Sequence, residues 1–105
     1  MLRIYGEVLE MLKELRPVMG ELERRDADLG RQLRRAAPSV ALNLAEGMYS
    51  RGKNRQVRYH SALGSAREVL ACMEVAEALG YMSGVNAALL GRMNRVIGTL
   101  VRLVR

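Results

Sequence analysis

Hydrophobic residues recur at helical spacing in four successive stretches of the chain. In the first, from about Leu2 to about Arg24, they step by three and four residues, a heptad pattern typical of a helix that packs lengthwise against its neighbours. The seam predicted for this helix consists of Tyr5, Val8, Leu12, Leu15, Met19 and Leu22. Pro17 lies inside the pattern and removes one backbone donor, so we expect a kink there, with a break as the alternative.

A second helix is predicted from a turn at Asp26 to about Ser50. Asp26 suits the N-cap position, where its side chain can accept a backbone hydrogen bond, and Asp28 adds negative charge near the helix N-terminus. Pro38 could bend this helix, and Ser39 could hydrogen-bond into the turn that it frees. The apolar face consists of Leu29, Leu33, Ala36, Ala37, Val40, Leu44 and Met48. Small residues at Ala36, Ala37, Ala41 and Ala45 permit a neighbouring helix to approach closely.

The third helix is predicted to end at about Leu79. Gly52 suits a left-handed position in the preceding turn, and Asn54 is the expected cap. Gly64 and Ser65 indicate a close backbone contact with a neighbouring helix. The predicted seam consists of Tyr59, Leu63, Ala66, Leu70 and Met73.

Gly80 should end the third helix, and Ser83 is the expected cap of a fourth that runs to about Val104. Its predicted seam consists of Val85, Leu89, Met93, Val96, Leu100 and Leu103. A wider apolar arc, which also takes in Leu90, Ile97 and Val101, exceeds what one core needs and suggests a subunit interface. Three basic residues should lie opposite the seam, facing either Glu residues of another helix or solvent: Arg92, Arg95 and Arg102.

Four helices with short connections predict an all-α protein, an antiparallel up-down-up-down four-helix bundle. A chain of 105 residues corresponds to one domain, residues 1–105. Such a domain buries a small core and often gains stability by association, so we expect an oligomer. The chain has no Phe or Trp, so Leu, Val, Ala and Met must build the core.

Positive charge is concentrated in residues 31–58, where Glu46 is the only acidic residue. The net charge of +6 and the pI near 10.2 favour an acidic partner: nucleic acid, anionic lipid or an acidic protein. The predicted nucleic-acid-binding residues are Arg31, Arg34, Arg35, Arg51, Lys53, Arg55 and Arg58. A solvated face, or ion pairs between subunits, is the alternative. Only Tyr49 and Tyr59 lie nearby, so binding should depend on the phosphate backbone more than on base stacking.

The sequence contains no recognisable catalytic pattern. His60 is the only histidine and lacks the Glu-x-x-His spacing of bundle metal sites, because Val57 stands three residues before it. We interpret His60 as a surface or interface residue. A phosphate-binding glycine loop and a nucleophile elbow are both absent. We therefore expect no enzyme activity, no metal, no cofactor and no small-molecule substrate.

Two further side chains could carry chemistry but have simpler structural interpretations. Cys72 lies near the seam of its helix and suits a small core position, and a single cysteine fits a reducing cytoplasm. Glu46 and Glu68 could form a pair of catalytic carboxylates, but a polar network with Asn43, or a bridge from Glu46 to an arginine, is favoured. The chain shows no signal peptide and no apolar run of about 20 residues, so we expect a cytoplasmic protein without membrane contact.

Several short motifs resemble one known family. They are QLRRAA at residues 32–37, Ser39, NLAEG at 43–47, R-Y-x-x-A-x-G-S-x-x-E at 58–68, and L-G-Y at 79–81. Together they are similar to the "four helix bundle protein" family. It includes proteins encoded in intervening sequences of bacterial large-subunit ribosomal RNA genes, and the accessory variability proteins of diversity-generating retroelements.

This resemblance implies a barrel-like homopentamer. In the retroelement branch it also implies binding of a partner reverse transcriptase and of nucleic acid. We therefore expect a non-enzymatic basic scaffold that binds nucleic acid, a nucleic-acid enzyme such as a reverse transcriptase, or both. The alternative is a protein–protein adaptor whose basic residues serve subunit assembly or an acidic partner.

Overall fold

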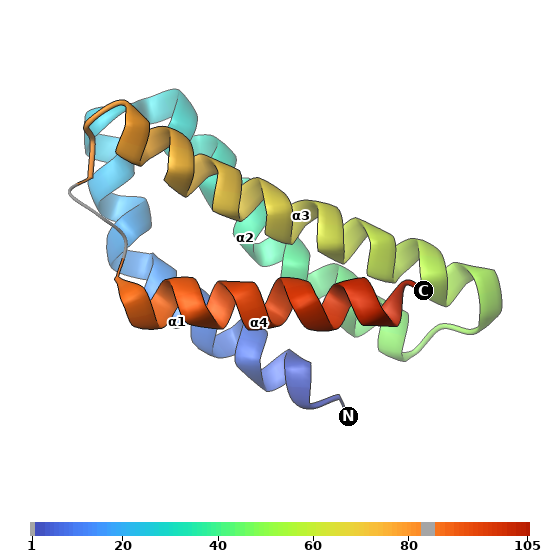
Figure 1. The fold of residues 1–105 in the computed structure, drawn as a ribbon. Helices are drawn as coiled ribbons and strands as arrows, with labels where there is room; N and C mark the ends of the chain where they lie inside the picture. The colour runs from blue at the N-terminus through green and yellow to red at the C-terminus, as the bar shows by residue number, and fades with distance from the viewer. Residues whose placement is uncertain (1, 83–85) are drawn as a thin grey trace.

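The computed structural model describes residues 2–82 and 86–105, which form four α-helices. These are α1 (Arg3–Arg25), α2 (Ala27–Met48), α3 (Gly52–Ala78) and α4 (Ala87–Leu103). The α1–α2 connection, the end of α3 and the start of α4 lie at one end of the molecule, and the α2–α3 connection lies at the other end with both chain termini (Figure 1). No strand occurs in the described ranges, so the predicted all-α class with four helices is confirmed.

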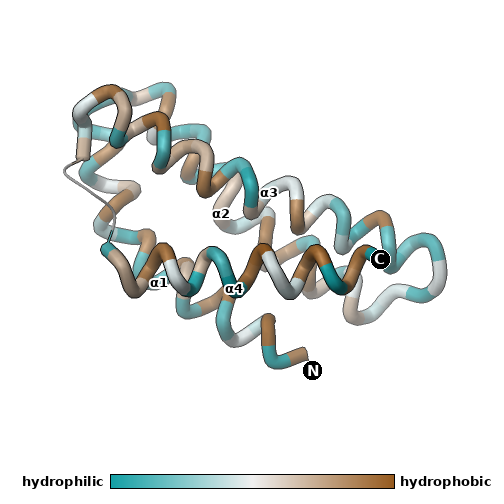
Figure 2. The backbone as a smooth tube through the Cα atoms, viewed as in Figure 1, coloured by the Kyte–Doolittle hydropathy of each residue, from teal (hydrophilic) through white to brown (hydrophobic). Residues whose placement is uncertain are grey.

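The helices surround one aliphatic core. Helix α2 packs against α1 and α3, and α4 packs against α3 and α1, so each helix has two neighbours. Hydrophobic residues recur at short intervals along every helix (Figure 2), and their buried members form a single cluster. That cluster consists of Leu, Val, Ala and Met residues with Ile4, Tyr59 and Cys72, as the lack of Phe and Trp predicts.

The buried face of α1 differs from the predicted heptad seam. Ile4 and Met11 are buried, whereas Tyr5 and Leu12 pack only at the edge of the core. The buried residues of α1 repeat on average every 3.6 residues, which is the period of a straight helix. The heptad period is shorter, so the predicted seam and the buried stripe separate toward one end of the helix. The helix is continuous through Pro17, so a break there is wrong.

Apart from Val85, which lies outside the described residues, the predicted seams of the other helices are mostly buried. In α2, α3 and α4 the exceptions are Met48, Leu70 and Leu103, which are only partly buried. Helix α2 is also continuous through Pro38.

Asp26 alone connects α1 to α2. Its backbone N–H donates to the Leu22 carbonyl at 2.8 Å, and its side-chain Oδ1 accepts from the Leu29 N–H at 3.0 Å. One residue therefore satisfies a carbonyl of α1 and an amide of α2, and the predicted N-cap is confirmed.

The starts of the last two helices differ from the predictions. Gly52 has the expected left-handed φ of +56°, but it is the first residue of α3, so the predicted Asn54 cap is wrong. Ser83 lies outside the described residues. Asn86 caps α4, since its Oδ1 accepts from the N–H groups of Ala88 and Leu89 at 2.8 and 3.3 Å.

The end of α3 is closed by a glycine motif. Gly80 has φ +79°, its N–H donates to the Glu77 carbonyl at 3.0 Å, and the Tyr81 N–H donates to the Ala76 carbonyl at 2.9 Å. This pair of bonds defines a Schellman motif, which requires the left-handed conformation that glycine adopts most easily. The prediction that Gly80 ends α3 is confirmed.

Small residues bring α2 and α3 into close contact. Gly47 lies directly against the buried Tyr59 ring, and a Cβ built on Gly47 would lie only 2.4 Å from Tyr59 Cε1. Two turns away, the Ser65 hydroxyl lies 2.8 Å from the Ser39 hydroxyl across the two helices. The predicted close contact thus involves Ser65, whereas nothing lies near the exposed Gly64.

Substitution of Gly47 tests this contact. We expect Gly47→Ala to lower the free energy of unfolding by about 1–3 kcal/mol, because the added methyl group must displace a ring that is packed on every side. Gly64→Ala is the matched control: it adds the same methyl group to an open helix surface and should raise stability by about 1 kcal/mol. Chemical denaturation of both variants measures the two effects, and equal stabilities would contradict the contact.

Candidate nucleic-acid interface

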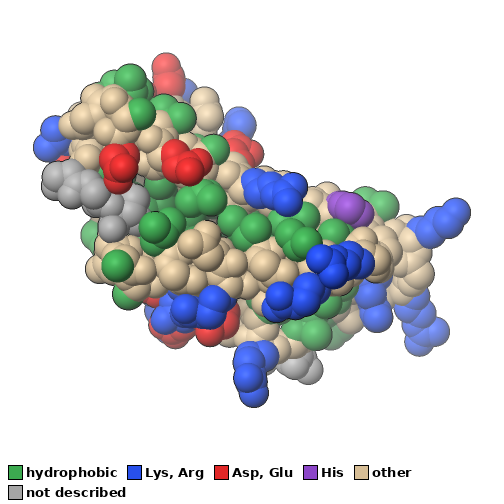
Figure 3. Space-filling model, in the orientation of Figure 1, with side chains coloured by type: hydrophobic (Ala, Val, Ile, Leu, Met, Phe, Trp, Pro, Cys, Tyr) green, Lys and Arg blue, Asp and Glu red, His purple; other side chains and the backbone are tan. Residues whose placement is uncertain are grey.

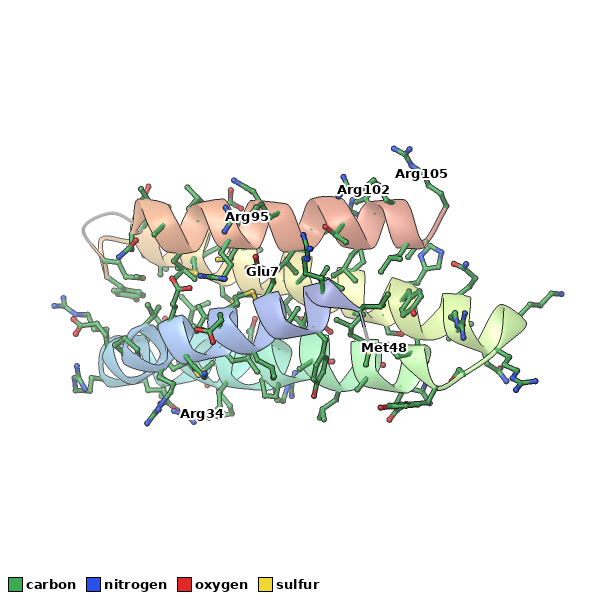
Figure 4. All side chains as sticks on the ribbon, turned by 90° about the horizontal axis from the view of Figure 1, so that it is seen from below. Glu7, Arg34, Met48, Arg95, Arg102 and Arg105 are labelled. Atoms are coloured by element: carbon green, nitrogen blue, oxygen red, sulfur yellow. The ribbon has the colours of Figure 1, made fainter. Side chains whose placement is uncertain are left out.

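The seven predicted basic residues fall into two groups. Arg31, Arg34 and Arg35 lie in the first half of α2, and the other four lie around the α2–α3 connection. The helical rise puts Arg34 about 21 Å from Met48 along α2. Figure 4 accordingly shows Arg34 and Met48 well apart along the bundle. The sequence-predicted residues therefore do not form a single patch on one chain.

Two arginines of the first group are held by acidic residues. Arg34 donates two hydrogen bonds to the Glu23 carboxylate, at 2.8 Å from Nε and 2.6 Å from a terminal nitrogen. These bonds lower the pKa of Glu23 and raise that of Arg34. Arg31 pairs with Asp28 at 3.3 Å, one turn away on α2. Arg35 is exposed, and no acidic side chain of the described residues lies within ion-pair distance of it.

Two residues of the second group fasten the α2–α3 turn. Arg55 Nε donates to the carbonyls of Ser50 and Gly47, at 2.9 and 3.2 Å, so the guanidinium satisfies the exposed end of α2. Arg58 Nε pairs with Glu46 at 2.9 Å. Lys53 and Arg51 are exposed and have no acidic partner in the described part of the chain.

Glu46 and Glu68 do not form a pair of catalytic carboxylates. Ser39 faces Ser65 and Gly47 faces Tyr59, so Glu46 and Glu68 lie on opposite sides of the serine contact. The rise per residue then separates them by about 15 Å along the helices. The bridge from Glu46 to Arg58 agrees with the structural interpretation.

Asn43 belongs to a polar network between α2 and α3. Its Nδ2 donates to the carbonyl and hydroxyl oxygens of Ser39, both at 3.0 Å. Its Oδ1 lies 3.4 Å from an Arg58 nitrogen. The Ser39 hydroxyl therefore bonds to the side chains of Asn43 and Ser65. This network fixes the register of the two helices.

Sequence reasoning missed several basic residues that the fold brings to the α2–α3 turn. Arg3 begins α1, Arg102 lies in the last turn of α4, and Arg105 follows that helix. All three therefore lie at the end of the bundle that carries the chain termini (Figures 1 and 4). We call this region the basic end. It consists of Arg3, Arg51, Lys53, Arg55, Arg58, Arg102 and Arg105. In Figure 3 basic side chains dominate the half of the molecule nearest the termini, whereas acidic ones appear in the other half.

A detectable signal for these residues lay in the predicted topology. In an up-down-up-down bundle, the start of the first helix, the end of the last and the second connection meet at one end. Charge counting along the sequence could not find Arg3 or Arg105, because neither adjoins residues 31–58.

Arg92 joins α4 to α1 and is not part of the basic end. Its guanidinium forms ion pairs with both Glu7 and Glu14, and only 25% of its side-chain surface is exposed. The hydrogen bond with Glu14 is the main reason that its pKa is raised. Arg92 thus faces Glu residues of another helix, whereas Arg95 and Arg102 are exposed.

The remaining candidate groups occupy structural positions. Cys72 is 3% exposed in the core, and its pKa is raised by burial and then by the charge of Glu68. His60 is exposed on α3. No group of three or more His, Cys, Asp or Glu side chains in the described ranges is arranged to hold a metal ion. None of the described helices is both long and apolar enough to cross a membrane.

Tyr81 connects the end of α3 to the α1–α2 junction. The negative charge of Asp26 is the main reason that the pKa of Tyr81 is raised, with burial and a hydrogen bond to Asp26 adding to it. The L-G-Y motif is thereby explained: Gly80 closes the helix, and Tyr81 then approaches the residue that caps α2.

Four helices around one aliphatic core, with basic side chains gathered at one end, define a small basic four-helix protein. Residues 1–102 match the model of the 23S rRNA-intervening sequence protein family, and the chain belongs to that family. This confirms the intervening-sequence branch of the resemblance. Comparisons with curated proteins and with solved structures gave no match.

The burial of Cys72 leads to a prediction about its reactivity. At pH 8 we expect a disulfide reagent such as DTNB to modify the folded protein far more slowly than the chain unfolded in guanidinium. The raised pKa leaves little thiolate, and the core excludes the reagent. Absorbance at 412 nm follows the reaction. A folded protein that reacts as fast as the unfolded chain would contradict the core position.

Proposed function

We propose that this chain is a non-enzymatic scaffold, an antiparallel up-down-up-down bundle, that binds nucleic acid through its basic end. The supporting observation is a set of exposed cations that the fold leaves without acidic partners. Within the described residues, Arg3, Arg51, Lys53, Arg102 and Arg105 form no ion pair. Such cations can neutralise phosphates and release counterions without first breaking an ion pair.

The bonds made by the other two cations near the turn support this proposal. Arg55 and Arg58 fasten the turn through hydrogen bonds to backbone and to Glu46. They thereby fix the positions from which Arg51 and Lys53 project. Most of the cations are arginines, which bind phosphate oxygens in pairs. We favour nucleic acid over lipid or an acidic protein because the family's description, 23S rRNA-intervening sequence protein, is compatible with a nucleic-acid ligand.

Neutralising the two cations at the turn tests the proposal. We expect Arg51→Gln with Lys53→Gln to weaken binding of a single-stranded RNA by a factor of about 5 per lost contact at 0.1 M salt. The slope of log affinity against log salt should become shallower by about 0.7 per contact. Fluorescence anisotropy with a labelled oligonucleotide at several salt concentrations measures both.

The matched control removes the same charge at the other end of the bundle. Arg24 and Arg25 end α1, and both pair with Glu21, so Arg24→Gln with Arg25→Gln should change binding little. If the wild-type protein does not bind at low salt, the proposed function is wrong. Equal losses in both variants would show that net charge, not the basic end, governs binding.

Exposed hydrophobic side chains favour a second candidate, a protein–protein adaptor. Leu42, Tyr49 and Val57 are 64%, 86% and 59% exposed on α2, the turn and α3. Such groups suit contacts with further copies of the chain, expected to give a homopentamer, or with a protein partner such as a reverse transcriptase.

We expect Tyr49→Ser with Val57→Ser to lower the mass of the assembly measured by light scattering, because the substitutions remove apolar contact area between subunits. Leu9→Ser, at an exposed site on α1, is the control. An unchanged mass would contradict a role of these two side chains in assembly. A wild-type protein that is monomeric would contradict the oligomer itself.

A further inference from the structure

A shallow groove runs between the first turns of α1 and the middle of α4. Its volume is about 270 Å³, and it is lined by Arg3, Ile4, Glu7, Arg95, Val96 and Thr99. Figure 4 shows Glu7 on α1 and Arg95 on α4 at the same level of the two facing helices. The groove begins at Arg3, so it continues the surface of the basic end.

Two arginines at the rim of the groove have no ion-pair partner among the described residues. Arg3 and Arg95 are both exposed, and neither has an acidic side chain within ion-pair distance among the described residues. Glu7 is the only acidic residue of the lining, and its carboxylate is paired with Arg92. Arg3 and Arg95 are therefore both available to an anion that enters the groove.

The fold keeps these two like charges at one groove. Arg3 is followed by the buried Ile4, and Arg95 is followed by the buried Val96. The core fixes these neighbours and, with them, the backbone positions from which the two arginines extend. Both arginines line the groove, and the positive potential that they add there would attract an anionic ligand.

The floor and the wall of the groove suit an anion with an attached apolar or hydroxyl-bearing group. Ile4 and Val96 contribute an aliphatic floor. The Thr99 hydroxyl accepts a hydrogen bond from Arg102 at 3.1 Å, so its own proton is available to a ligand oxygen. A volume of about 270 Å³ is too small for most whole drug-sized ligands. It is large enough for one sugar–phosphate unit of a chain that continues over the surface.

We propose that this groove binds one phosphate and its attached sugar from a single-stranded segment of nucleic acid. Arg3 and Arg95 grip the phosphate from either side, Thr99 donates to an oxygen, and the sugar lies on Ile4 and Val96. This inference rests on the proposed function, which it extends from the basic end onto the α1–α4 face. A single strand fits better than a duplex, because its sugars can rotate toward the floor.

The test compares two double variants that remove the same charge. Arg3→Gln with Arg95→Gln empties the groove of cations. Arg16→Gln with Arg67→Gln is the control, because both residues are exposed and form no ion pair with described residues. Arg16 lies about 20 Å along α1 from Arg3. Binding of a fluorescein-labelled 20-nucleotide oligouridylate is measured by anisotropy from low to moderate salt.

If the groove binds a phosphate, the log–log salt slope of the Arg3/Arg95 variant becomes shallower than that of the wild type by up to about 1.4, at 0.7 for each neutralised charge. The control slope changes by less than half as much. If the two variants are indistinguishable while the wild type binds, the groove proposal is wrong and the proposed function stands. If the wild type does not bind the oligonucleotide, both are wrong.

A third pair of variants separates the groove from its charged rim. Thr99→Gln fills the groove without altering charge, and Thr99→Ser keeps the hydroxyl. Weaker binding by the Gln variant, with the Ser variant unchanged, supports entry of the sugar–phosphate. Unchanged binding by the Gln variant overturns it. Uridine monophosphate and inorganic phosphate are then titrated as competitors. Full displacement by inorganic phosphate at millimolar concentration would mean that a free anion, not a strand, is the ligand.

Discussion

The close approach of α2 and α3 is the constraint on which the other features of this structure depend. It requires glycine at position 47, because the Tyr59 ring occupies the space of a side chain. It also places the Ser39 and Ser65 hydroxyls within 2.8 Å of each other. Once these two contacts are set, Arg55 reaches the end of α2 and Arg58 reaches Glu46. The turn that carries Arg51 and Lys53 is thus a consequence of helix packing.

This constraint explains why the family motifs point to a fold more than to a reaction. The NLAEG stretch supplies Asn43, Glu46 and Gly47, and the second motif supplies Arg58, Tyr59 and Ser65. Each of these six side chains or Cα positions lies in the α2–α3 contact or bonds across it. A partly buried polar network whose members bond to one another favours one register, because a shift of one helical turn would leave donors and acceptors without these partners. These two motifs therefore identify the architecture, and the cations at the turn that have no acidic partner among the described residues, Arg51 and Lys53, lie outside them.

The fold could be predicted because hydrophobic periodicity and capping chemistry are local. Asp26 and Gly80 act where the sequence placed them, since a cap depends on its immediate neighbours. The predicted Asn54 cap was wrong because Gly52 begins α3 two residues earlier. A glycine with positive φ can begin a helix as well as end one. The prediction that Tyr5 and Leu12 belong to the buried seam was wrong. A heptad template assumes a shorter repeat than a straight helix has, so it cannot follow the buried face along α1. The site was harder to predict, because pairing is a property of three-dimensional neighbours. Arg34 and Arg35 are adjacent and alike in sequence, yet only Arg34 reaches Glu23.

The distribution of acidic residues decides where positive charge remains on this surface. Glu21, Glu23 and Asp28 lie near the α1–α2 connection and pair with the arginines there. Glu7 and Glu14 are both committed to Arg92, which fixes α4 against α1. At the opposite end Glu46 pairs with Arg58, so the arginines at the start of α1 and the end of α4 have no acidic partner among the described residues. A net charge of +6 could have been spread evenly. Here acidic residues balance arginines near the α1–α2 connection, and positive charge is left in excess at the opposite end.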